Sequence, residues 1–249
     1  MKRPLAHLAL AAVLLASCTA KAATVPPPVT PSSSSSTIER TITVAATTTT
    51  TTEAPSTTTL PLLQRIVANP TSEVAHAFPI ASGVNASYAH THGEYPATDV
   101  FADCGTEILA MATGVVQHVR RVDTYNAKTD NPALRGGKSV SVVGFDAVRY
   151  YTSHLDRIDV VEGQPVKAGD VLGTIGLTGD SEACHTHIGL SPLCPTTEWS
   201  VRRGVIWPWP YLDVWRRGDE KQPASEITSW LLAHPATCST AEADPNATD

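Results

Sequence analysis

The chain has 249 residues, with 18 lysines and arginines against 24 aspartates and glutamates, and its formal net charge is −6. Arginine pairs such as Arg202-Arg203 are isolated and are expected on the solvated surface, so the chain offers no electrostatic footprint for nucleic acid. Nucleotide chemistry is not expected either, because Gly136-Gly137-Lys138-Ser139 lacks the first glycine of a phosphate-binding loop and has Pro132 in its place.

The N-terminus has the layout of an export signal. Lys2 and Arg3 precede an apolar run over residues 5–16, and small residues stand directly before Cys18. This resembles a lipoprotein signal peptide over residues 1–17, whose cleavage leaves Cys18 as the lipid-modified first residue. An ordinary secretory signal cut elsewhere is the alternative. In either case we expect an exported protein, and the lipoprotein form would be anchored to the outer face of the cell membrane with its domain in the cell wall or periplasm.

Residues 18–64 are rich in serine, threonine and proline and contain almost no large apolar residue. Such a segment cannot bury enough surface to offset the entropy lost on ordering. We expect a disordered tether, with a passive spacer or glycosylated stalk as the alternative.

The remainder has the length of one domain with its own core, predicted over residues 65–220, followed by a C-terminal helix and flexible tail over 221–249. Short β-branched or aromatic runs bounded by glycine, proline or aspartate predict strands at 115–119, 139–143, 148–154, 171–175 and 187–190. Residues 144–147 read as a hairpin connection. Helical patterns occupy 211–217 and 223–234. The fold class is therefore mainly β, an antiparallel β-sandwich or open barrel with short C-terminal helices.

Four cysteines remain besides Cys18. Because an exported protein lies in an oxidising compartment, these four predict two disulfides. Three pairings are possible, and a short bridge between Cys184 and Cys194 is weakly favoured because they flank one strand and a Ser191-Pro192 turn. A zinc site using Cys184 and His185 is a competing reading. It is disfavoured because adjacent strand residues point to opposite faces.

His185 and His187 are two residues apart on a predicted strand, so their side chains share a face. One imidazole could hold a metal while the other handles protons beside it. His92, Asp99 and His154 could complete such a site. Together these residue types suggest a zinc hydrolase.

These segments resemble the LytM/lysostaphin-type zinc metallopeptidases, which cut peptide bonds in bacterial peptidoglycan. The resemblance runs in family order through residues 95–99, 104–116, 150–155, 160–173, 176–179 and 185–187. It implies that Zn²⁺ is held by His92, Asp99 and His187. It further implies that His185 is a general base or orients the water, and that His154 donates to the developing oxyanion.

Two points stay open within this resemblance. The commonest family pattern places the first histidine four positions before the aspartate, whereas His92 precedes Asp99 by seven and His90 by nine, so His90 is the alternative first ligand. Tyr150 and Tyr151 point to opposite faces of their strand, and one of them is expected to face the substrate.

Three functions follow for comparison. The first is a lipid-anchored zinc endopeptidase acting on peptidoglycan peptides, without nucleic-acid or nucleotide partners. The second is a non-catalytic LytM-like lipoprotein that binds the wall or activates a hydrolase. The third is a disulfide-stapled structural lipoprotein whose histidines are incidental.

Overall fold

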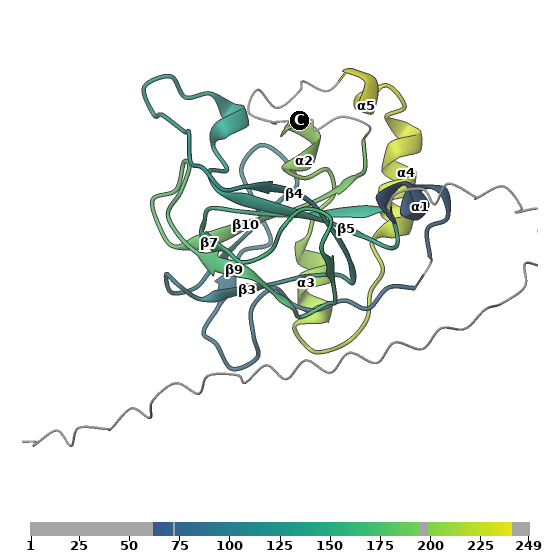
Figure 1. The fold of residues 1–249 in the computed structure, drawn as a ribbon, viewed down its shortest axis with the longest axis horizontal. Helices are drawn as coiled ribbons and strands as arrows, with labels where there is room; N and C mark the ends of the chain where they lie inside the picture. The colour runs from purple at the N-terminus through teal and green to yellow at the C-terminus, as the bar shows by residue number, and fades with distance from the viewer. Residues whose placement is uncertain (1–61, 72, 195–198, 241–249) are drawn as a thin grey trace, which may run out of the picture. The chain divides into compact units, whose positions relative to one another are not determined.

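A computed structural model describes residues 62–71, 73–194 and 199–240 (Figure 1). The predicted signal peptide, Cys18 and nearly all of the predicted tether lie outside these residues. None of the helices in the described ranges is long and apolar enough to span a membrane.

The larger of two sheets has seven strands, and each strand pairs antiparallel with its neighbours. In spatial order they are β1 (Ser87–Tyr88), β2 (Thr98–Phe101), β10 (His185–Pro192), β6 (Val148–Ser153), β5 (Ser139–Gly144), β4 (Gly114–Arg120) and β8 (Pro165–Val166). The longest strand, β10, therefore lies between β2 and β6, and its side chains have neighbours on both sides.

The smaller sheet is also antiparallel and has three strands, β3 (Glu107–Leu109), β9 (Val171–Ile175) and β7 (Leu155–Ile158). The chain passes from β6 to β7, and hence from one sheet to the other, through the single residue His154. His154 has a φ of 63°, a left-handed conformation that is uncommon for a residue with a side chain. Its backbone N–H donates to Gly136 and its carbonyl accepts from Gly176, so the corner is fixed on both sides.

The predicted fold class is confirmed: the described chain is mainly antiparallel sheet with a few short helices. All five predicted strands are present, and residues 145–147 connect β5 to β6 as an antiparallel hairpin. One strand end was misplaced, because β6 stops at Ser153 and His154 forms the corner instead.

Two of the helices were predicted. Helix α3 (Trp209–Trp215) begins two residues earlier than expected, after Pro208 and with Pro210 in its first turn, and α4 (Ala224–Ala233) follows Pro223. The others were not predicted: α1 (Leu62–Ala68), α2 (Trp199–Arg202), α5 (Thr237–Thr240) and a 3₁₀ turn, η1 (Pro132–Leu134). Of these, α2 matters most for function, because it packs against β10.

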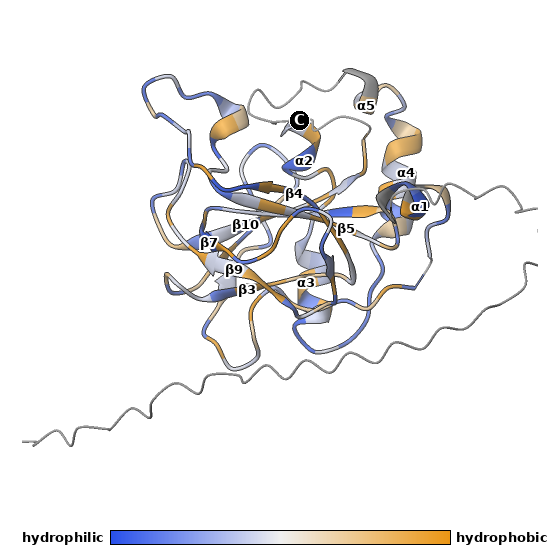
Figure 2. Ribbon diagram, in the orientation of Figure 1, coloured by the Kyte–Doolittle hydropathy of each residue, from blue (hydrophilic) through white to orange (hydrophobic). Residues whose placement is uncertain are grey.

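The core lies along the central strands, and every residue of β5, β6 and β10 is buried. Its largest fully buried apolar side chains include Leu155, Leu172, Ile188, Leu190 and Leu212. Each contributes about 1.5–3 kcal/mol relative to exposure. Ile227 is the buried residue of α4 and packs into this core. Figure 2 shows hydrophobic residues of this helix in orange. This packing holds the ends of β2, β6 and β10 in a fixed relation.

Two disulfides are present, as predicted, but they join Cys104 to Cys184 and Cys194 to Cys238. The favoured bridge between Cys184 and Cys194 was wrong. Strand β10 continues through Ser191-Pro192 without turning, which separates its two flanking cysteines by roughly 25–30 Å, far beyond disulfide reach. The Cys184 thiolate is also excluded as a zinc ligand, since its sulfur is bonded to Cys104.

Candidate metal centre

The pairing of β2 with β10 brings an aspartate to a histidine. Asp99 lies directly opposite His187 in the antiparallel register, and Phe101 lies opposite His185. Cross-strand partners share a face of the sheet. Accordingly, His187 Nδ1 is 3.1 Å from Asp99 Oδ1 and His185 Nε2 is 3.8 Å from the same oxygen.

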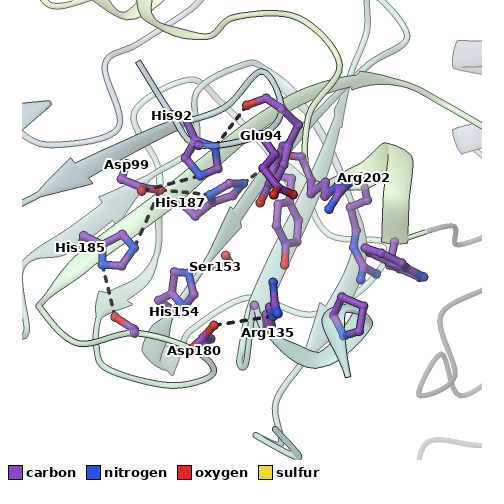
Figure 3. Close-up of a pocket in the computed structure, with 18 of the residues that line it drawn as sticks. His92, Glu94, Asp99, Arg135, Ser153, His154, Asp180, His185, His187 and Arg202 are labelled. Carbon is purple, nitrogen blue, oxygen red and sulfur yellow. Dashed lines mark hydrogen bonds and ion pairs between the residues drawn. The ribbon is translucent and has the colours of Figure 1, made fainter. Parts of the chain in front are cut away.

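His92, from the loop between β1 and β2, completes a group of three potential metal ligands with Asp99 and His187. One donor atom from each of the three lies within 4.8 Å of the other two. His92 Nε2 is 3.8 Å from Asp99 Oδ2, and the two histidine rings lie 5.0 Å apart in an edge-to-face arrangement. Figure 3 shows the three side chains converging, with His185 and His154 beside them.

The alternative first ligand, His90, does not join this group. Its Nε2 is 3.2 Å from Asp213, its ring stacks on Trp209 at 4.2 Å, and half of its side chain is exposed. The structure therefore brings together the residues that the resemblance implied as ligands, with His92 rather than His90 in the first position.

Backbone carbonyls set the tautomers of the two histidines in the group. His187 Nε2 donates to the Arg203 carbonyl at 2.9 Å, and His92 Nδ1 donates to the Tyr95 carbonyl at 3.1 Å. A carbonyl oxygen only accepts, so the hydrogen must be on the ring nitrogen that faces it. In a neutral ring, this leaves lone pairs on His187 Nδ1 and His92 Nε2, the two atoms that face Asp99.

This arrangement suits a bound cation. In neutral His187 a lone pair on Nδ1 faces a carboxylate oxygen 3.1 Å away, a repulsive contact unless positive charge lies between them. A metal ion bound to both atoms removes the repulsion. Two imidazoles and a carboxylate are also the donor set that zinc accepts in catalytic sites, where a fourth position stays open. The residues present therefore fit zinc.

Two further histidines line the same space with their tautomers set in the same way. His154 Nδ1 donates to the Thr178 carbonyl at 2.8 Å, and His185 Nδ1 donates to the Ala183 carbonyl at 2.8 Å. Their rings are 4.6 Å apart. The Nε2 of each neutral ring therefore carries a lone pair and accepts a hydrogen bond or a proton.

Burial and neighbouring charge shift the pKa values here. Burial lowers the pKa of His154 to about 4, and burial followed by the charge of His187 lowers the pKa of His92. Burial raises the pKa of Asp99, but a hydrogen bond from His187, available when its ring carries a second proton, and the positive charges of the nearby histidines outweigh it and leave that pKa below its usual value. Near neutral pH the site thus has an ionised carboxylate beside a neutral His154.

The group lies in a cleft of about 800 Å³. Tyr151 lines the cleft, whereas Tyr150 points into the core and donates to Asp146, which answers which tyrosine faces the site. The expectation that Arg202-Arg203 is solvated surface was wrong. Arg202 is 4% exposed and both arginines line the cleft, because α2 brings them onto β10.

Sequence reasoning missed Arg203, Tyr95 and Trp199 as parts of the site. The backbone carbonyls of Arg203 and Tyr95 orient two ligands, a contribution that leaves no trace in residue type. The one signal available was the grouping of a tryptophan with two arginines, Trp199, Arg202 and Arg203, close after the histidine strand.

Part of the chain that carries this geometry is similar to known proteins. Residues 93–196 match the model of peptidase family M23, a stretch that contains Asp99, His154, His185 and His187 and begins one residue after His92. The glycyl-glycine endopeptidase ALE-1 of Staphylococcus capitis is 30% identical over 96 residues, which are 38% of this chain and 24% of that protein. The chain thus matches about a quarter of the length of this relative.

Two solved structures are also similar. The catalytic domain of lysostaphin from Staphylococcus simulans has a TM-score of 0.40 and 23% identity, covering 61% of this chain and 97% of that one. A zinc-containing peptidase from Vibrio cholerae has a TM-score of 0.38 and 20% identity, covering 48% and 37%. Residues 93–196, which hold Asp99, His154, His185 and His187, are thus the part of the chain that is similar to peptidase family M23.

Proposed function

We propose that the protein is a zinc-dependent endopeptidase that hydrolyses peptide bonds in bacterial peptidoglycan. One observation carries the proposal: three potential ligand atoms lie within 4.8 Å of one another, beside two more histidines whose Nδ1 atoms are held by backbone carbonyls. The family match and the glycyl-glycine endopeptidase relative support the same class of reaction.

His92, Asp99 and His187 would hold the zinc. When bound, zinc polarises the scissile carbonyl and lowers the pKa of a coordinated water toward about 7. The chain's own task is then to orient the water and move its proton.

His185 is the better placed base. Its Nε2 lies 3.8 Å from Asp99 Oδ1, so the ring stands beside a proposed zinc ligand, where it can take the proton of the attacking water. The Nδ1 contacts with Ala183 and Ser181 hold the ring in place. The resulting imidazolium can then return the proton to the nitrogen of the leaving amine.

For His154, the geometry favours a different role from the expected oxyanion donor. In the neutral ring, the single N–H donates a hydrogen bond to the Thr178 carbonyl, and burial disfavours a second proton on the ring. Its Nε2 would therefore accept a hydrogen bond, from the attacking water or from a substrate N–H. Donation to an oxyanion would require the protonated ring.

The predicted lipid anchor, tether and location also belong to this proposal. An enzyme attached through Cys18 and a segment of about 44 residues would average on the order of 35–40 Å from its anchor, within reach of the wall polymer. The two disulfides support an exported protein, since such bonds persist in oxidising compartments. Labelling with radioactive palmitate tests the anchor: Cys18→Ser should abolish the label and release the protein from the membrane fraction.

Activity is tested by incubating the zinc-loaded protein with cross-linked muropeptides, with and without a chelator, and restoring zinc afterwards. We expect cleavage that the chelator stops and zinc restores. If the zinc-loaded protein binds peptidoglycan but leaves every cross-link type intact, the protein is instead a wall-binding or hydrolase-activating module.

A further inference from the structure

Arg203 presents a fixed guanidinium on one wall of the metal cleft. Its Cζ lies 4.1 Å from the centroid of the Tyr95 ring and 5.0 Å from that of Trp199, so two aromatic faces hold it. The Tyr95 ring is in turn 4.6 Å from the ring of His92 and 5.8 Å from that of His187. A single aromatic ring therefore separates the guanidinium from the proposed zinc ligands.

The charge of Arg203 has no counterion in the described part of the chain. Neither Glu94, which lines the same cleft, nor any other described carboxylate forms an ion pair with it, and its buried Nε has no hydrogen-bond partner. Arg135, in the same cleft, differs: its Nη2 lies 2.6 Å from Asp130 and its Nε donates to the same carboxylate.

An arginine in this state is suited to bind an anion. Stacking against aromatic faces uses the plane of the guanidinium and leaves its edge N–H groups available. Those N–H groups match the two oxygens of a carboxylate, and a buried donor without a partner is costly unless a ligand satisfies it. The cleft is also lined by the carboxylates of Asp180 and Glu182, and Asp180 lies 3.7 Å from Arg135. Within this cleft, the guanidinium of Arg203 is therefore a favourable place for an anionic group.

We infer that Arg203 binds a free carboxylate of the substrate peptide next to the scissile bond. This inference rests on the proposed function and deepens it, because it selects one class of cross-link: peptides with a carboxylate flanking the bond that is cut, in preference to those in which that group is amidated or absent. Arg203 is then a specificity-determining residue whose side chain contacts substrate while its backbone carbonyl orients His187.

The test compares two forms of one cross-linked muropeptide, with the carboxylate beside the cross-link free or converted to the carboxamide. Cleavage of both is measured for the zinc-loaded wild type, Arg203→Gln and Arg203→Lys, with zinc content and Tm as checks on folding. Arg217→Gln is the matched control, because Arg217 is exposed, pairs with Asp219 and lies outside the cleft.

We expect the wild type to prefer the free carboxylate by about ten- to a hundredfold in kcat/KM, the range for a charge-assisted hydrogen-bond pair. Arg203→Gln should lose this preference by cutting the carboxylate form more slowly, Arg203→Lys should keep part of it, and Arg217→Gln should behave as wild type. Equal cleavage of the two peptides by the wild type overturns the inference. So does an Arg203→Gln variant that keeps its zinc and its preference.

Calorimetric binding of the two peptides to zinc-loaded His185→Ala separates this inference from the proposed function. In one outcome, the protein binds the carboxylate form more tightly, Arg203→Gln abolishes this preference, and the wild type cleaves neither form. That outcome refutes the peptidase and keeps the carboxylate site. Cleavage of both forms with equal binding keeps the peptidase and refutes the site.

Discussion

His187 and Arg203 are joined by a hydrogen bond of 2.9 Å, from the Nε2 of the histidine to the backbone carbonyl of the arginine. The carbonyl lies just past α2, and the approach of this turn to β10 fixes which nitrogen of His187 is free for a metal. Outer contacts of this kind hold metal-binding imidazoles in orientation and tautomer. The position of a short helix is therefore part of the ligand geometry.

Gly189 makes this approach possible. It follows His187 by two residues on the same face of β10, and a Cβ added there would lie 2.5 Å from the Arg203 carbonyl oxygen. Gly189→Ala should displace that carbonyl and weaken zinc binding by about 10–100-fold, as loss of an outer-shell partner does. Competition with a zinc-binding dye measures the affinity. Arg203→Gln is the control, since it retains the carbonyl and should bind zinc as the wild type does; equal affinity in Gly189→Ala would refute the role of the hydrogen bond.

The proposed zinc ligands and the proposed base should fall into two classes on substitution. His187→Ala and Asp99→Ala each remove one of three ligands and should lose zinc. His185→Ala should keep zinc and lower kcat by about 10²–10⁴-fold, the contribution of a general base. Zinc content by atomic emission and kcat on the same preparations separate the classes. Metal and activity both retained in His187→Ala would make the assignment wrong.

The disulfide between Cys104 and Cys184 should support the site as well as the fold. Cys184 directly precedes His185, and the bridge closes a loop over 80 residues of separation. Replacing both cysteines with serine should lower the free energy of unfolding by about 2–5 kcal/mol. It should also lower kcat, because the start of β10 loses its tie to the loop after β2.

The second disulfide provides the comparison. Cys194 and Cys238 join the segment after β10 to α5, and neither residue lines the cleft. Their replacement by serine should lower stability with kcat unchanged at a temperature where both proteins are folded. Equal kcat losses in the two double variants would show that only global stability matters.

Asp146 should make stability fall as pH rises. Burial raises its pKa, and the hydrogen bonds from Tyr150 and Val148 offset this only in part. The folded protein therefore holds this proton at pH values where the unfolded chain, with a pKa of about 3.9, has lost it. This contribution is fully present below the unfolded pKa and is lost as pH rises through the folded pKa.

Asp146→Asn removes that titration. The free energy of unfolding of the wild type minus that of the variant should decrease from about pH 4 upward and then level off. Urea denaturation of both proteins across this range measures it. A pH-independent difference, or one that grows with pH, would contradict the raised pKa.

The sequence predicted those parts of the molecule that depend on local pattern and on residue type. Segments such as 139–143 and 171–175 are rich in β-branched and apolar residues, which favour β-strands. His185 and His187 had to share a face once they lay on a strand. Whether His92 or His90 lies next to Asp99 depends on the path of an irregular loop, which the sequence pattern does not predict.

What was missed depends on contacts between distant segments. The disulfide partners of Cys184 and Cys194 are 80 and 44 residues away in the sequence. The two cysteines could not pair with each other, because strand β10 continues through Pro192 instead of turning there. The four residues of α2 have no helical period of their own, so its packing on β10 and the burial of Arg202 could be seen only in the folded chain.

Anomalous scattering at the zinc edge, from crystals of the zinc-loaded protein, locates the ion itself. We predict one strong peak at about 2.0–2.2 Å from His92 Nε2, from an oxygen of Asp99 and from His187 Nδ1, with His185 and His154 outside bonding distance. A peak bound through His90, His185 or His187 Nε2, or no peak near Asp99, would contradict the metal centre.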